Sequence, residues 1–383
     1  MTMNSQQLLA RLVGFPTVSR DTNRALIDFV RNFLGDCGVD SRLFESADGR
    51  KANLYATVGP QDREGVLLSG HTDVVPVDGQ QWTSDPFVLT ERDDRLYGRG
   101  SADMKGFLAC ALAMAARASR EPLKVPLHLA LSYDEEVGCV GVRSLIDAMG
   151  SWPQRPRLCI VGEPTLLKTA VGHKGKMALR ARCCGHPAHS AFPGQGINAI
   201  HLAAELVARL RARQAQIELN GPRDAGYEVP TSTLHVGTIH GGTALNIIPE
   251  SCEMALEIRT IAADNPQDLL AGLRTDAALI AAAASRAGLR AAIDISVTNE
   301  YPGLETPNDA EIVALTTALT GEPDCVKVAY GSEGGLFSGQ LGIPTVVCGP
   351  GSIDQAHKAD EYIAVEQLHR CDLMLDTLLH RLR

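Results

Sequence analysis

The stretch VLLSGHTDVVPV, residues 66–77, combines an apolar run with residue types that bind metal ions. The run 66–68 predicts a buried strand of a parallel sheet, and His71 follows it closely. Open α/β sheets bind their ligands at the carboxyl ends of such strands. Asp73 could accept the other ring N–H of His71 and fix its tautomer. On this stretch alone, a metal ligand and a partly buried loop histidine are equally good interpretations.

Five more residues of the same types stand at or just beyond expected strand ends: Asp103, Glu135, Glu136, Glu163 and His357. Each one alone is explained by a helix cap, a solvated charge pair or a surface histidine. Together, two histidines and several carboxylates form a ligand set that suits zinc. The set is too large for one tetrahedral ion, and it fits two ions about 3.5–4 Å apart that share a carboxylate. One of the two adjacent glutamates would remain as a general base, and the spacing does not tell which.

Strands that alternate with helices must position these residues, which predicts an α/β fold. The apolar spacing predicts helices at 5–14, 23–36, 107–118, 309–319 and 364–382. It predicts strands at 53–58, 66–70, 126–132, 157–162 and 344–348. We therefore expect a discontinuous catalytic domain, residues 1–176 and 298–383, with a mostly parallel sheet flanked by helices.

Residues 177–297 follow a different pattern, in the order strand-helix-strand-strand-helix-strand. This is the order of an α+β ferredoxin-like unit, which we expect to be an inserted domain of a usual size. Its second helix is expected to begin after Asn265 as N-cap, with Pro266 in the first turn.

The composition of the 383-residue chain limits the class of function. The net charge of −9 argues against a nucleic-acid partner, and no apolar stretch has the ~18 residues of a membrane span. The ten cysteines include no C-x-x-C, and no export signal is visible. These features predict reduced thiols and a cytoplasmic location.

The motifs SGHTDVVP, YGRGSADMKG, SYDEEVG, GEPT and AHKADEY resemble those of the dinuclear-zinc aminoacylase, desuccinylase and carboxypeptidase family, over essentially the whole chain. The resemblance implies that His71, Asp103 and Glu163 hold one zinc ion. It implies that Asp103, Glu136 and His357 hold the other, with Asp103 bridging. It further implies that Glu135 is the general base and that Asp73 orients His71. Two Zn²⁺ per subunit are expected, with Co²⁺ or Mn²⁺ as substitutes.

Segments of the inserted domain, GHPAHSAFPGQGINAI, GGTALNIIPE and EIRT, also resemble the family. This implies that His189 stabilises the oxyanion in the active site of a dimer partner, and that Asn246 and Arg259 hold the substrate carboxylate. The domain is accordingly expected to serve as a lid and as a homodimer interface. Without the resemblance, His189 is interpreted as a loop histidine and Arg259 as a member of an ion pair on a strand.

The segment GSEGGLFS resembles a loop near the substrate pocket. Glu333 is expected to help bind a cationic substrate side chain, and a glutamate at a helix start is the alternative. The resemblance implies hydrolysis of a small N-acyl amino acid, and the runs GEPT, HKG, SEGG and CGPGSIDQAHKADEY favour N2-acetyl-L-ornithine, giving L-ornithine and acetate in arginine biosynthesis. Succinyl-diaminopimelate, or a broad range of N-acyl amino acids or peptides, is the alternative substrate. A non-catalytic binding protein on this fold is a remote alternative, because all residues of the metal centre are present.

Overall fold

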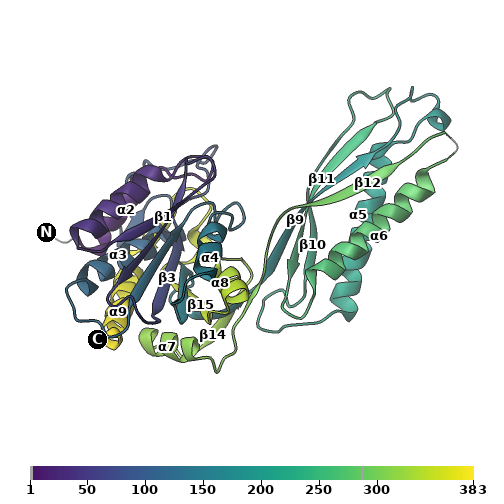
Figure 1. The fold of residues 1–383 in the computed structure, drawn as a ribbon. Helices are drawn as coiled ribbons and strands as arrows, with labels where there is room; N and C mark the ends of the chain where they lie inside the picture. The colour runs from purple at the N-terminus through teal and green to yellow at the C-terminus, as the bar shows by residue number, and fades with distance from the viewer. Residues whose placement is uncertain (1–2, 287) are drawn as a thin grey trace. The chain divides into compact units, whose positions relative to one another are not determined.

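The computed structural model describes residues 3–286 and 288–383 (Figure 1). The chain forms two compact units, and it passes between them after His173 and before Leu304. The first unit consists of residues 1–173 and 304–383, and the second unit consists of residues 174–303. Within the described residues, no helix is both long enough and apolar enough to cross a membrane.

The first unit contains a large mixed sheet, with strands in the order β1-β2-β6-β3-β7-β15-β8-β13 and with β14 beside β8. These strands are β1 (Ser41–Glu45), β2 (Ala52–Val58), β3 (Val66–His71), β6 (Leu127–Ser132), β7 (Leu158–Pro164), β8 (Thr169–His173), β13 (Leu304–Glu305), β14 (Cys325–Val328) and β15 (Thr345–Gly349). The four central neighbours β6, β3, β7 and β15 run parallel, whereas β1, β2 and β13 pair antiparallel. The α/β class is confirmed, and the parallel part of the sheet is its centre.

Helices cover both faces of this sheet (Figure 1). The helices are α1 (Ser5–Val13), α2 (Arg24–Asp36), α3 (Gly106–Ala118), α4 (Val142–Gly150), α7 (Glu311–Thr320), α8 (Gly334–Leu341) and α9 (Val365–Leu382). Helix α3 packs between α1 and α9 and is apolar on nearly every side, which explains why almost all of it is buried. Helices α4 and α8 pack together on the other face. A small sheet of β4 (Thr90–Arg92), β5 (Arg95–Tyr97) and β16 (Tyr362–Ala364) completes the unit.

The parallel centre of the sheet determines where the site lies. Because β6, β3 and β7 run in one direction, their carboxyl ends meet at one edge. His71 is the last residue of β3, Glu163 is the penultimate residue of β7, and Glu135 and Glu136 follow β6. All six residues of β3 are buried, so this edge belongs to the packed interior of the unit.

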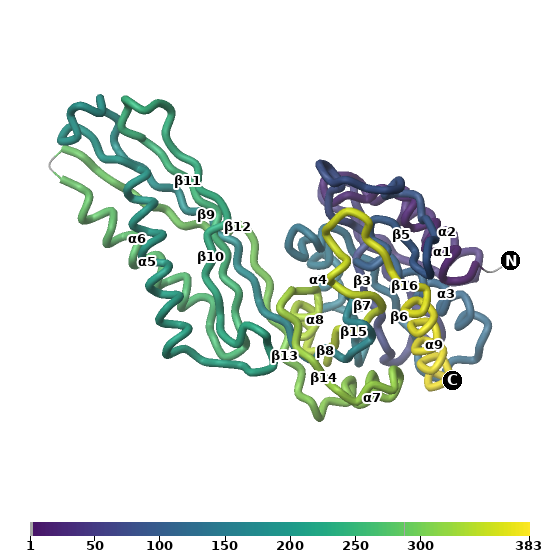
Figure 2. Tube along the Cα trace, turned by 180° about the vertical axis from the view of Figure 1, so that it is seen from behind, coloured from purple at the N-terminus to yellow at the C-terminus, as the bar shows by residue number. Residues whose placement is uncertain are grey.

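The second unit is a four-stranded antiparallel sheet with two helices on one face (Figure 2). Its elements are β9 (Gly175–Cys184), α5 (Ala199–Asn220), β10 (Thr233–Gly241), β11 (Ser251–Thr260), α6 (Pro266–Ala284) and β12 (Ala292–Tyr301). The strand order β10-β11-β9-β12 is the arrangement of a ferredoxin-like unit. The side chain of Asn265 accepts the N–H of Gln267 at 3.0 Å, so the predicted N-cap of α6 is observed.

One segment has the alternative that the sequence left open. Residues 331–338 were expected as a loop or as a helix start at Glu333, and helix α8 begins directly after Glu333. The segment GGLFSG contains three glycines, which disfavour an isolated helix, and packing against α4 and the sheet supports it.

Candidate metal centre

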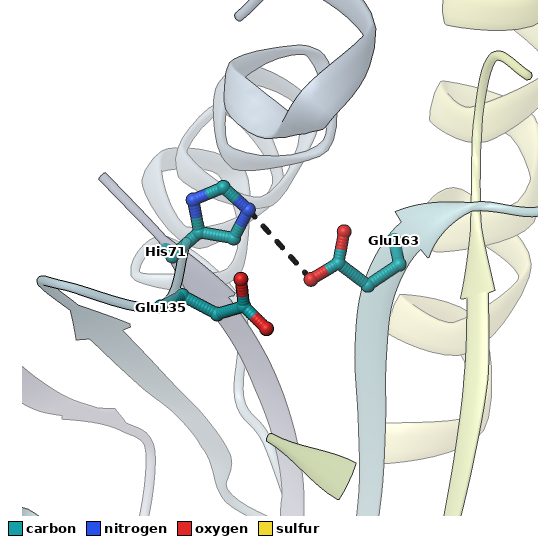
Figure 3. Close-up of side chains that lie close together, drawn as sticks. All are labelled: His71, Glu135 and Glu163. Carbon is teal, nitrogen blue, oxygen red and sulfur yellow. Dashed lines mark ion pairs between the residues drawn. The ribbon is translucent and has the colours of Figure 1, made fainter. Parts of the chain in front are cut away.

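His71 lies at the end of β3 with only 1% of its surface exposed. Its Nδ1 atom lies 2.8 Å from the main-chain carbonyl oxygen of Asp73. A carbonyl can only accept, so Nδ1 carries the proton and the lone pair of the neutral ring is on Nε2. This Nε2 atom lies 3.1 Å from Oδ1 of Asp103 and 3.7 Å from Oε1 of Glu163 (Figure 3). Burial lowers the pKa of His71, but the charges of Glu163 and Asp103 outweigh it and raise this pKa well above its usual value.

Asp103 lies between the two predicted metal-binding histidines. Its Oδ1 atom faces Nε2 of His71 at 3.1 Å, and its Oδ2 atom faces Nε2 of His357 at 3.2 Å. The same Nε2 atom of His357 lies 3.1 Å from Oε2 of Glu136. A carboxylate with one oxygen directed to each histidine has the geometry required to bridge two cations.

The site holds more buried negative charge than its two histidines can balance. Burial raises the pKa of Glu136 and of Glu163 to about 7, and it raises the pKa of Glu135 well above its usual value. Within the described residues, Oε1 of Glu136 is buried without a hydrogen-bond partner. Buried carboxylates without a countercharge are costly, and divalent cations would compensate them. The residues present therefore fit metal ions.

The donor atoms of these side chains are also close enough to one another to bind a common metal ion. Donor atoms of His71, Glu135 and Glu163 lie within 4.8 Å of one another, as do those of His71, Asp103 and Glu136. Figure 3 shows the carboxylates of Glu135 and Glu163 directed toward the ring of His71. The predicted base, Glu135, thus lies beside two of the predicted ligands, His71 and Glu163. Gly162, directly before Glu163, lets the ring of Phe107 pack against β7, because a Cβ atom on Gly162 would lie 2.0 Å from that ring.

Asp73 organises the turn that carries both glutamates. Its carboxylate accepts the N–H groups of Glu135 at 3.1 Å and Glu136 at 3.3 Å, and the hydroxyl of Ser19 at 2.7 Å. The same carboxylate lies 3.7 Å from Nδ1 of His71, so the hydrogen bond to this ring comes from the main-chain carbonyl instead. Sequence spacing indicated Asp73 as the partner of His71, but it did not indicate the hydrogen bonds from the N–H groups of residues 135 and 136 to the Asp73 carboxylate.

The predicted residues His189, Asn246 and Arg259 belong to the second unit. His189 and Asn246 lie on adjacent exposed loops, joined by a hydrogen bond of 3.0 Å from the N–H of Ser190 to the carbonyl of Asn246. Arg259 donates to both carboxylate oxygens of Glu257, at 2.8 and 3.2 Å. The ion pair on a strand, left open by the sequence, is thus present in the structure.

Glu333 directly precedes α8, and 1% of its surface is exposed. Its Oε2 atom accepts the hydroxyl of Ser69 at 3.3 Å. Burial raises the pKa of Glu333 to about 7. The alternative of a glutamate at a helix start is therefore present in the structure, and a role in substrate binding stays a prediction.

An acid-rich centre of this kind, at the carboxyl edge of an α/β sheet, is typical of metal-dependent hydrolases that use two ions. The family model of peptidase family M20/M25/M40 matches residues 67–381, and the chain belongs to this family. It is therefore a hydrolase of a family that is typically dependent on two metal ions.

Curated relatives extend over nearly the whole chain. An acetylornithine deacetylase of Pasteurella multocida is 35% identical, over 97% of this chain and 96% of the relative. An acetylornithine deacetylase of Myxococcus xanthus is 37% identical, over 96% and 94%. Because these matches cover nearly the whole chain, they extend over both the first unit, which carries the metal centre, and the second unit.

Solved structures share the fold at lower identity. A metallo-carboxypeptidase of the M20 family from Sulfolobus solfataricus superposes with a TM-score of 0.81 at 18% identity, over 98% of each chain. A dinuclear metal-binding peptidase of the same family from Bacillus subtilis superposes with a TM-score of 0.69 at 15% identity, over 99% of this chain and 97% of that one.

Proposed function

We propose that this protein is a zinc-dependent amidohydrolase that converts N2-acetyl-L-ornithine and water to L-ornithine and acetate. The observation that carries the hydrolytic part is the placement of Asp103 between His71 and His357, among buried carboxylates. The choice of acetylornithine is supported by relatives of that name at 34–37% identity over most of the chain.

Two metal ions per chain would be held as the donor set suggests. His71 and Glu163 would bind one ion and Glu136 and His357 the other, with Asp103 shared. We propose zinc, which suits nitrogen and carboxylate ligands, with cobalt or manganese as substitutes. When bound, the ions would polarise the acyl carbonyl and lower the pKa of attacking water toward ~7.

Glu135 would act as the general base. Its carboxylate is buried beside His71 and Glu163, where it can accept a proton from water as the oxygen attacks the acyl carbon. The same carboxyl group would then return that proton to the departing nitrogen, so that acetate and a free amine leave. Burial favours this exchange because it brings the pKa of Glu135 above that of a solvated glutamate.

His189 would stabilise the oxyanion, in the active site of a second copy of the chain. Its Nδ1 atom accepts the N–H of Ala191 at 3.1 Å, so the proton of the neutral ring is on Nε2, which is then free to donate. Asn246, on the adjacent loop, and Arg259 would bind the substrate carboxylate. A bidentate guanidinium suits this group, although Arg259 would have to exchange Glu257 for the substrate.

A substrate panel tests the proposal. We expect chelator-sensitive hydrolysis, with kcat/KM for N2-acetyl-L-ornithine at least about tenfold above that for N-acetyl-L-methionine, N-succinyl-L,L-diaminopimelate or a dipeptide, a difference of about 1.4 kcal/mol. Activity should return when zinc is restored. A preference for the succinylated substrate would favour the desuccinylase alternative. Hydrolysis that persists in metal-free protein would contradict the proposal.

Glu333→Gln tests the predicted contact with a cationic side chain. Within the described residues, Oε1 of Glu333 is buried without a hydrogen-bond partner, which supports an additional cationic donor. We expect the substitution to lower kcat/KM for acetylornithine about tenfold more than for acetylmethionine, because only the former carries a side-chain ammonium. Equal losses for the two substrates would show that Glu333 does not select the side chain.

We further propose a homodimer through the second unit. Strand β10 is an edge strand, and Ile200, Leu245 and Ile247 form an exposed apolar patch beside it, with Leu245 fully exposed. Exposed edges and apolar patches are common association sites. The patch adjoins Asn246 and the loop of His189, which the reaction would use.

Leu245→Asp is expected to raise the dimer dissociation constant by about 10²-fold or more. Burial of a leucine side chain stabilises an interface by about 1.5–3 kcal/mol, and a symmetric interface contains this leucine twice. Sedimentation velocity across a concentration series measures this constant. Leu219→Asp is the matched control, since Leu219 is 76% exposed at the other end of α5. A monomeric wild-type protein, or equal effects of the two variants, would refute the interface.

A further inference from the structure

Glu361 is a buried carboxylate outside the ligand set, and both of its oxygens are fully engaged with the segment that carries Asp103. Its Oε1 atom accepts the N–H groups of Ala102 at 2.9 Å and Asp103 at 3.1 Å. Its Oε2 atom accepts the N–H of Gly100 at 3.0 Å and Nη1 of Arg99 at 2.7 Å. Only 1% of Glu361 and of Arg99 is exposed.

The backbone before Asp103 is shaped for this contact. Gly100 has a φ of +82°, in the left-handed region that favours glycine. This turn allows three N–H groups, from residues 100, 102 and 103, to reach one carboxylate. Such hydrogen bonds to an ionised acceptor are among the stronger ones in proteins.

The same contacts reach the loop that carries His357. Glu361 follows His357 by four residues, and Nη1 of Arg99 also donates to the carbonyl of Lys358 at 3.3 Å. Nη2 of Arg99 donates to Oε1 of Gln80 at 2.5 Å, and Nε2 of Gln80 donates to the carbonyl of His357 at 3.2 Å. One network, buried at Glu361 and Arg99, therefore connects the Asp103 segment with the His357 loop.

We propose that Glu361 is a positioning residue that sets the separation of Asp103 and His357, and thereby the affinity of the metal position between them. The inference rests on the proposed dinuclear site. The other position depends less on this network, because β3 and β7 carry His71 and Glu163 independently of Glu361. Loss of an outer partner of a metal ligand typically lowers metal affinity 10–100-fold.

The test is Glu361→Gln, which keeps the size of the side chain. The amide would place an NH₂ group against N–H donors and would leave the charge of buried Arg99 uncompensated. Metal-free protein is titrated with Zn²⁺ in competition with a chromophoric chelator. We expect two binding events in the wild-type protein, the first at the position of His71 and Glu163 and the second at the position between Asp103 and His357. In the variant, the second event should be 10–100-fold weaker, with less than a threefold change in the first.

Two further variants separate positioning from general damage. Glu322→Gln removes a carboxylate paired with Arg370 at 2.9 Å in the same unit, and it should leave both events unchanged. Arg99→Lys keeps the positive charge but loses the guanidinium hydrogen bonds to Gln80 and to the carbonyl of Lys358. It should weaken the second event by a smaller factor than Glu361→Gln does. Circular dichroism of each metal-free variant reports whether it folds.

Unchanged second binding in Glu361→Gln would overturn this inference alone. Equal weakening of both events, or the same loss in Glu322→Gln, would also overturn it, because the effect would then be one on general stability. A wild-type protein with fewer than two events would instead overturn the proposed dinuclear site and this inference with it.

Discussion

Glu135→Gln is expected to lower kcat for acetylornithine by about 10²–10⁴-fold while the metal content of the protein stays the same. The amide retains the size of the carboxylate, but it cannot take a proton from water. Glu135 lies beside His71 and Glu163, and in the proposed reaction it is the residue that takes the proton of the attacking water. Steady-state kinetics and elemental analysis on one sample measure both quantities.

Glu136→Gln is the matched control, because it makes the same chemical change at the next residue of the same turn. Oε2 of Glu136 lies 3.1 Å from Nε2 of His357, so this variant should lose one metal ion. If Glu135→Gln loses metal and Glu136→Gln keeps it, the two roles are reversed. A fall of less than about tenfold in kcat for Glu135→Gln would show that Glu135 is not the base.

Asp103→Asn is expected to reduce turnover by about 10³-fold or more and to leave less than one metal ion per chain. The carboxylate presents one oxygen to each histidine, at 3.1 and 3.2 Å, and the amide would direct a donor at one of them. Metal ions supply several kcal/mol of transition-state stabilisation, and each 1.4 kcal/mol is about tenfold in rate.

The control for this variant is Asp147→Asn, the same change at an exposed position of α4. It should retain full metal content and full turnover. If Asp103→Asn still binds two ions as tightly as the wild-type protein does, Asp103 is not shared between them.

The sequence predicted the centre of the fold and the position of the site, because both depend on short local patterns. The run 66–68 has the apolar character of a buried parallel strand, and the structure ends β3 at His71. Carboxyl ends of parallel strands share an edge, so ligand-type residues after each run could be expected to meet. The antiparallel margins, such as β2 and β13, could not be predicted, because a short apolar run does not encode its direction.

Other features of the site depend on tertiary contacts that the spacing does not show. Arg99 and Glu361 look like solvated charges in the sequence, and only the fold buries them as a pair. The carboxylate of Asp73 was expected on His71, yet it accepts the N–H groups of residues 135 and 136. Such contacts join residues that are 62 to 262 positions apart, which a local pattern cannot indicate.

The most direct test is an anomalous difference map from crystals grown with zinc, recorded at the zinc absorption edge. Two peaks per chain are expected, one between His71 and Glu163 and one between His357 and Glu136, with both about 2.0–2.2 Å from oxygens of Asp103. A single peak, or peaks that Asp103 does not contact, would contradict the shared-carboxylate centre on which the proposed reaction depends.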